Sequence, residues 1–212
     1  MRKPGPPFLA LPDYQRIYQV AFSVLQTSGV AVTHRACLFF ACAGALIMRD
    51  HYGMKATISG GGLALMVDAA RKNVLVFARP DSSGWTADTS AFHVWNECNG
   101  WLIDFMAPIY GHSAKEDGAG FFVPARMMQK KLITTCEHPE ALGQSGDIWC
   151  RHDPDLVNEL IDAQPALFGD LLSTCSAWFR RPPRALAQLA LADSQGPAKK
   201  LELRAPAIVG AW

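Results

Sequence analysis

Residues 92–108 read FHVWNECNGWLIDFMAP, and this stretch decides the expected fold. Two short apolar runs flank Asn99-Gly100, and an Asn-Gly pair between strand-like runs is a strong signal for a hairpin. The reason is that both central residues of a type I′ turn need a positive φ. With these two residues as the loop, Cys98 faces Trp101 across the hairpin. The stretch therefore predicts two antiparallel strands in a fixed register.

The register places an imidazole beside a carboxylate. Side chains alternate along a strand, so His93, Trp95 and Glu97 share one face with Asp104 on the opposite strand. His93 and Asp104 are diagonal neighbours on that face, within reach of each other. A carboxylate next to a histidine orients the ring and stabilises its cation. The hairpin therefore predicts a His–Asp pair.

A third reactive residue lies upstream, in an apolar segment. Residues 33–51 are apolar nearly all round, which predicts a central buried helix, with Thr33 as its N-cap. Cys37 then falls one turn into the helix, where the positive end of the helix dipole favours a thiolate. Cys42, in the middle of the helix, lacks that help and is expected to be structural. Cys37, His93 and Asp104 are therefore the candidate catalytic residues.

These motifs resemble those of a known superfamily. Cys37, followed by GMKA at 53–56, HVWNE at 93–97 and WLID at 101–104, resembles the transglutaminase-like branch of the papain-like cysteine hydrolases. In particular, the chain is similar to a small bacterial family of unknown function within that branch. The resemblance covers residues 33–108. It implies a papain/transglutaminase-like core and a Cys-His-Asp triad that acts on amides or thioesters, without a cofactor or metal.

Stabilisation of an oxyanion is less clear from the sequence. Leu38 follows Cys37 where papain-like proteases carry tryptophan, and the nearest upstream glutamine is Gln26. The backbone N–H of Cys37 is one expected donor. Gln26, Thr33 and His34 remain open as the second donor, and Trp95 is a candidate wall of the substrate cleft.

The rest of the chain predicts an α+β domain. Helices are expected at 13–27, capped by Asp13 and ended by Gly29, and at 153–163, where Asp153-Pro154 is a cap followed by an N1 proline. The remaining predictions are helices at 166–179 and 184–193, strands at 54–67, 73–79, 127–133 and 199–204, and loops at 80–89, 111–120 and 137–146. With no visible boundary, residues 1–212 form one domain with a catalytic-type core at 33–108 and a helical portion at 153–193.

Composition excludes several classes of function. Half of the 212 residues are hydrophobic and the formal net charge is +1, so neither nucleic acid nor a membrane is an expected partner. The six cysteines come with no export signal, which favours reduced thiols and a cytoplasmic location. No motif for zinc or nucleotide phosphates is present, so no metal or cofactor is expected.

The functional hypothesis is thiol-dependent hydrolysis or transfer of an acyl group from a peptide or small-molecule amide or thioester. Two alternatives stay open. One is a catalytically silent domain of the same fold that binds a ligand, and the other is an assembly protein whose C-terminal helices form an interface. A homo-oligomer also remains open.

Overall fold

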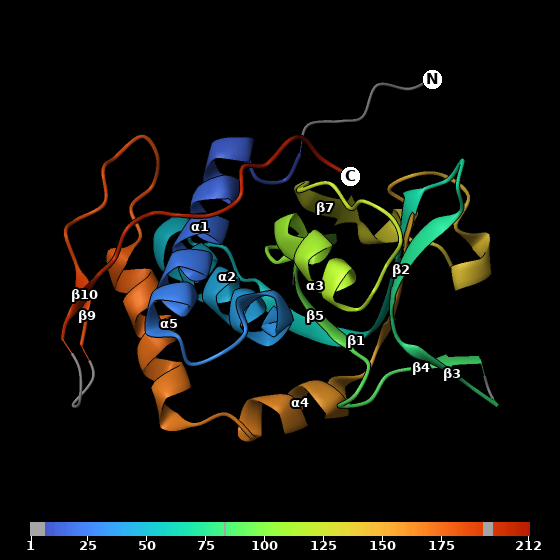
Figure 1. The fold of residues 1–212 in the computed structure, drawn as a ribbon, viewed down its shortest axis with the longest axis horizontal. Coiled ribbons are helices and arrows are strands. Elements are labelled where there is room, and N and C mark those ends of the chain that lie inside the picture. The colour runs from blue at the N-terminus through green and yellow to red at the C-terminus, as the bar shows by residue number, and fades with distance from the viewer. Residues whose placement is uncertain (1–6, 83, 193–196) are drawn as a thin grey trace.

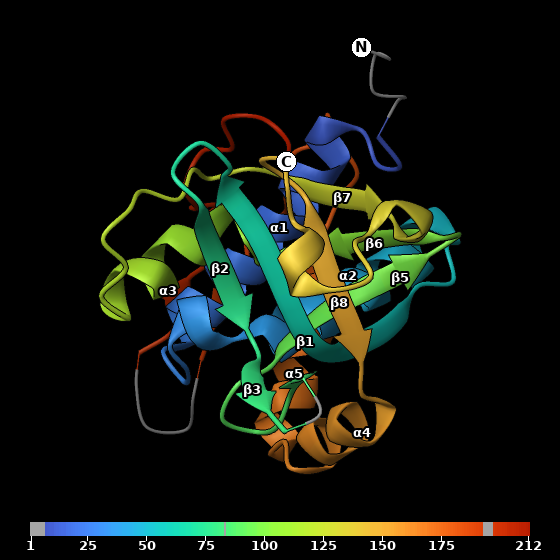
Figure 2. The same cartoon turned by 90° about the vertical axis from the view of Figure 1, so that its right-hand side faces the viewer.

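A curled antiparallel sheet forms a half-barrel around the central helix. The fold is taken from a computed structural model, which describes residues 7–82, 84–192 and 197–212. The strands run in the order β2-β1-β5-β6-β7, and β8 also pairs with β1. Their bounds are β1 Thr57–Asp68, β2 Asn73–Phe77, β5 His93–Cys98, β6 Trp101–Asp104, β7 Met128–Lys131 and β8 Ile148–His152. Figure 2 shows this sheet face-on, with α1 and α2 behind it.

The β5–β6 hairpin has the predicted register. Cys98 pairs with Trp101 and Glu97 pairs with Leu102. Asn99 and Gly100 have φ values of 49° and 76°, as a type I′ loop requires. The hairpin prediction is confirmed.

Strand β1 explains the glycine run at 60–62. Gly61 pairs with His93 of β5 and with His152 of β8. A Cβ on Gly61 would lie 2.1 Å from the carbonyl oxygen of Arg151, and its φ is 140°. Gly61 therefore allows another backbone to come close, and the strand runs on without interruption.

Helices cover the concave side of the sheet. Within the described residues the α-helices are α1 Leu11–Ser28, α2 Cys37–Tyr52, α3 Tyr110–Glu116, α4 Pro154–Asp162 and α5 Ala166–Trp178. α2 packs against α1, α5 and β5, so it is the central helix, as predicted. Figure 1 shows α1, α2 and α5 side by side and α4 leading from the sheet to α5. No helix in the described part of the chain is both long enough and apolar enough to cross a bilayer.

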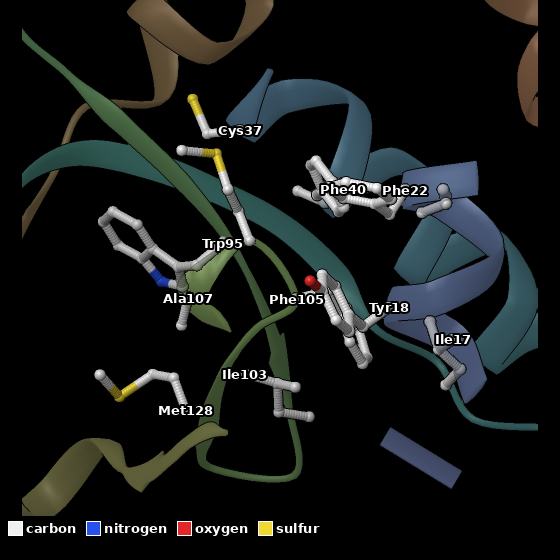
Figure 3. Packing of buried hydrophobic residues seen from close by; sticks show 14 of the residues in the cluster. Ile17, Tyr18, Phe22, Cys37, Phe40, Trp95, Ile103, Phe105, Ala107 and Met128 are labelled. Atoms are coloured by element: carbon white, nitrogen blue, oxygen red, sulfur yellow. The ribbon is translucent and has the colours of Figure 1, made fainter. Parts of the chain in front are cut away.

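The core fixes the position of α2 against the hairpin. Gly44 allows close contact, because a Cβ there would lie 2.3 Å from the Phe105 ring. Asn96 of β5 donates from Nδ2 to the carbonyl of Ala41, at 2.8 Å. Figure 3 shows Tyr18 and Phe40 gathered with Phe105 in this core. The sheet and the start of α2 are thus held in one rigid arrangement.

Two predicted helix caps are wrong. Thr33 does not cap α2: residues 33–35 form a separate 3₁₀ turn, η1 Thr33–Arg35, and the N-cap is Ala36. Cys37 is therefore the first residue of the helix, rather than one turn inside it. Asp13 does not cap α1, because the N-cap is Ala10. The Asp13 carboxylate accepts instead from the Tyr52 hydroxyl, at 2.7 Å.

Other boundaries were predicted correctly. Gly29 and Gly53 end α1 and α2 in the left-handed conformation, with φ of 69° and 65°. Asp153 caps α4, accepting from the backbone N–H of Leu156 at 3.0 Å. α5 ends next to Phe179, as expected.

Several loop and terminal predictions need correction. The segment 111–120, expected as a loop, holds most of α3, and the segment 80–89 contains most of a small ribbon, β3 Arg79–Asp81 and β4 Gly84–Thr86. Strand β8 was not predicted. The helix expected at 184–193 does not form over the described residues 184–192, which hold only β9 Ala190–Leu191, paired with β10 Lys199–Lys200. The strand expected at 199–204 is shorter than predicted, since β10 covers only Lys199–Lys200.

Candidate active site

Cys37 begins the central helix. The first N–H groups of a helix have no partner inside the helix, so the backbone around Cys37 offers free donors at the positive end of the dipole. The side chain is 6% exposed. In Figure 3 it lies at the margin of the core, with its sulfur pointing away from the ring of Phe40. The thiol is thus placed at the border of the packed interior.

His93 and Asp104 meet across the hairpin. The Nε2 atom of His93 lies 2.6 Å from Oδ2 of Asp104, and both side chains are 1% exposed. This is the contact expected from the diagonal positions. Since Nε2 faces the carboxylate, Nδ1 is the nitrogen left for another partner.

The Asp104 carboxylate accepts from three donors. Besides His93, the Tyr110 hydroxyl donates to Oδ2, and the backbone N–H of Met106 donates to Oδ1 at 2.8 Å. The Tyr14 hydroxyl of α1 donates to the backbone carbonyl of Asp104. The carboxylate is therefore fixed in place by two segments beyond the hairpin itself.

Tyr110 is a site residue that the sequence did not reveal. It is the first residue of α3, and its hydroxyl lies 3.0 Å from Nε2 of His93. Burial, and then the charge of Asp104, raise the pKa of Tyr110 well above its usual value, so the phenol keeps its proton. The only available signal was its position six residues after Asp104, which is not specific.

The electrostatics of the site favour an imidazolium. Burial alone lowers the pKa of His93, but the charge of Asp104 and its hydrogen bond oppose that effect. Cys37, which lines the same hollow, acts in the same direction, and the pKa of His93 rises to about 10. The ring also packs on Phe77, with 4.7 Å between ring centroids. His93 thus pairs with Asp104 and lines one hollow together with Cys37.

Two hollows meet at Cys37. The histidine hollow, of about 520 Å³, is lined by Cys37, His93, Tyr110, Phe77 and His34 among others. The apolar hollow, also of about 520 Å³, is lined by Cys37 and by residues of the 30–32 segment, α4 and α5. Both volumes are typical of small-molecule sites.

Among the other predicted site residues, His34 alone lines a hollow that Cys37 also lines. His34 lines the histidine hollow, with its Nε2 at 2.7 Å from Glu116 Oε2. Gln26 is exposed and lines a separate depression next to Lys199, and Thr33 sits in the η1 turn, lining neither hollow. Trp95 is fully buried and lines neither hollow.

Trp95 has a structural explanation. Its indole N–H donates to Glu97 Oε1 at 2.9 Å, and its ring packs against His152 at 5.5 Å between centroids. His152 also hydrogen-bonds to Glu97. These residues link β5 to the end of β8, so Trp95 does not form a wall of the cleft.

Metal-binding potential is low in the described residues. No three His, Cys, Asp or Glu side chains among them gather as a set of ligands. Each of the six cysteines is a free thiol. The chemistry available at the site is that of the thiol, the imidazole and the carboxylate.

Together, the fold and the site define a mixed α/β protein with a curled antiparallel half-barrel and a Cys–His–Asp cluster at the start of its central helix. Residues 10–212 match the model of the family described as protein of unknown function (DUF2026), and the chain belongs to this family.

A solved crystal structure of a genomics target is similar over the whole length of both chains. Identity is 33%, coverage is 100% of each chain, and the TM-score is 0.83. No curated protein matches the chain. The overall fold is thus shared with an experimental structure.

Proposed function

We propose that this protein is a thiol-dependent hydrolase or acyltransferase that acts on an amide or a thioester. The observation that carries the proposal is that His93, paired with Asp104, lines one hollow together with Cys37. The Nε2 atom of the ring is held by the carboxylate at 2.6 Å, and in the proposed mechanism Nδ1 serves the sulfur. This is the arrangement in which a base activates a nucleophile and a third group orients the base.

The reaction has two steps. The sulfur of Cys37, as thiolate, attacks the carbonyl carbon, and the bond to the leaving nitrogen or sulfur breaks while His93 gives that atom its proton. Water or an amine then attacks the thioester carbonyl, His93 takes the proton of the attacking group, and the Cys37 sulfur leaves. Asp104 orients the ring and stabilises its cation throughout, and no cofactor is required.

Stabilisation of the oxyanion falls to the start of α2. The free backbone N–H of Cys37 lies at the positive end of the helix, where negative charge develops on the carbonyl oxygen. His34 is the second donor that fits best, because it lines the same hollow as Cys37 and His93. Its Nε2 contacts Glu116, so the donor in this role is Nδ1 of the protonated ring.

The architecture supports the same class. A buried cysteine helix packed on an antiparallel sheet, with histidine and aspartate on adjacent strands, is the arrangement that the papain/transglutaminase-like resemblance implies. We propose that residues 33–108 form such a core. The free thiols suit a reducing compartment such as the cytoplasm.

A silent binding domain is the second candidate, and burial favours it: His93 is 1% exposed and Cys37 is 6% exposed. Alkylation by iodoacetamide at neutral pH, mapped by peptide mass spectrometry, separates the two proposals. An active site makes Cys37 react at least tenfold faster than Cys42, whose pKa burial raises to about 12.

The variants make this test sharper. His93→Ala should remove the excess reactivity of Cys37. His152→Ala is the matched control, since His152 also touches a carboxylate on the sheet but makes its contacts with Glu97 and Trp95. Equal reactivity of Cys37 and Cys42 in the wild type would refute the enzyme and favour the silent domain.

A further inference from the structure

The apolar hollow is a second cavity that Cys37 lines. It lies between the 30–32 segment, the start of α2 and the α4–α5 junction. Its walls include Val32, Leu160, Leu167 and Phe168. The C-terminal helices, which the proposed chemistry does not use, therefore form one wall of a site around the nucleophile.

The hollow offers no free charge to a ligand. Arg35 is the single charged residue among the described residues that line it, and its guanidinium is paired with Glu116 and Asp117. Gln164, also in the lining, donates from its amide to the carbonyl of Leu160 at 2.9 Å. A charged or strongly polar group would lose its hydration here without compensation, whereas an apolar group would gain from burial.

The position of His93 distinguishes the roles of the two cavities. The ring that protonates the leaving atom must reach it, so the leaving group lies in the hollow that His93 lines. His93 lines the histidine hollow and does not line the apolar hollow. The group on the other side of the scissile carbonyl, the acyl group, is therefore directed toward the apolar hollow.

We infer that the apolar hollow binds the acyl portion of the substrate, and that this portion is an uncharged aliphatic chain. That the bound group is an acyl group rests on the proposed function. That it is apolar rests on the lining of the cavity alone. It makes the C-terminal helices a specificity element, selecting long-chain over short-chain acyl groups.

Alkyl methanethiosulfonates test this without any turnover. The Cys37 sulfur attacks the alkyl-bearing sulfur, methanesulfinate leaves, and a mixed disulfide forms. Labelling rates for methyl, butyl and octyl reagents are measured at Cys37 and at Cys136, a partly exposed thiol outside both hollows. We expect the octyl-to-methyl rate ratio at Cys37 to exceed that at Cys136 by tenfold or more, since each buried methylene favours binding by up to about fourfold.

Two variants assign the effect to one hollow. Leu167→Asp puts a charge into the apolar hollow at a side chain that is 46% exposed, and Val76→Asp does the same to the histidine hollow at 39%. Leu167→Asp should abolish the gain with chain length, and Val76→Asp should leave it. If Leu167→Asp does not fold, Val32→Asp, at a more exposed wall position, replaces it.

The outcomes separate the two proposals. Equal octyl-to-methyl rate ratios at Cys37 and Cys136 would overturn the assignment of the apolar hollow, even if the protein hydrolyses thioesters. So would a rise in labelling rate with chain length that Val76→Asp removes and Leu167→Asp does not. A gain that depends on Leu167, combined with unchanged alkylation of Cys37 by iodoacetamide in His93→Ala, would keep the apolar site and refute the catalytic triad.

Discussion

The two histidines that line the histidine hollow each pair with a carboxylate, at almost the same distance but in very different surroundings. His93 and Asp104 are 2.6 Å apart and each is 1% exposed. His34 and Glu116 are 2.7 Å apart, with exposures of 23% and 56%. Distance alone would rank the two pairs as equal, so their difference in burial must decide what each one does.

Burial makes the His93–Asp104 pair behave differently from the His34–Glu116 pair. Around Asp104, Tyr110 and the Met106 N–H saturate the carboxylate, and water has little access. Around Glu116, the competing partner is Arg35, and solvent screens every charge. Breaking a buried pair leaves an uncompensated charge, whereas breaking an exposed one returns both groups to water. The buried pair should therefore control both stability and reactivity.

The largest effect should come from Asp104→Asn. The amide has nearly the shape of the carboxylate, but its NH₂ group accepts no hydrogen bond, so at least one of the donors His93, Tyr110 and Met106 N–H loses its acceptor. We expect a loss of about 3–5 kcal/mol in the free energy of unfolding, measured by urea denaturation, because a buried partner is left unpaired. The excess reactivity of Cys37 toward iodoacetamide should also disappear. A stability within error of the wild type would show that burial does not distinguish the two pairs.

A pH-dependent effect should come next. Because the pKa of His93 is raised to about 10, its protonated form stabilises the fold. That contribution is complete below pH 6.5 and is lost as the pH rises toward 10. The stability difference between wild type and His93→Gln should therefore shrink by an amount on the order of 3 kcal/mol over this range.

The control for this pH effect is the same comparison in the Asp104→Asn background. Without the carboxylate, most of the dependence on pH should vanish. A difference that grows with pH in the wild-type background would mean that His93 is neutral in the folded protein at pH 7.

Tyr110→Phe tests the newly found member of the site. The variant lacks the hydroxyl that donates to the Asp104 carboxylate. Loss of a hydrogen bond to a charged group is expected to lower the free energy of unfolding by about 1.5–3 kcal/mol. With one donor fewer, the carboxylate and the His93 ring are held less firmly in place, so the excess reactivity of Cys37 toward iodoacetamide should fall. Loss of stability with unchanged reactivity of Cys37 would make Tyr110 a packing residue only.

The hairpin was predictable because its information is local. The Asn99-Gly100 turn and the alternation along the strands fix the register, and the register fixes the contact between His93 and Asp104. The start of α2 was less predictable. Thr33 is a good cap by residue type, yet residues 33–35 form a 3₁₀ turn, and the Ser113 hydroxyl of α3 donates to the carbonyl of His34 in that turn.

What the sequence did not reveal depends on contacts between distant segments. Tyr110 reaches Asp104 only because α3 folds back beside the hairpin. Strand β8 is short, and it forms because Gly61 lets its backbone come close to β1. The apolar hollow needs α4 and α5 to meet the 30–32 segment, which no local pattern encodes.

The smallest effect should come from Glu116→Gln. Glu116 is exposed, so the loss of its charge leaves no buried group unpaired, and Arg35 keeps Asp117 as a partner. The melting temperature should stay essentially unchanged, and Cys37 alkylation should change less than about twofold, as is usual for exposed pairs. Added salt should reduce even that change, because screened charges already contribute little. A tenfold effect on Cys37 would reverse the comparison, since it would mean that the charge cluster at the rim of the hollow, rather than the buried pair, governs access to the sulfur.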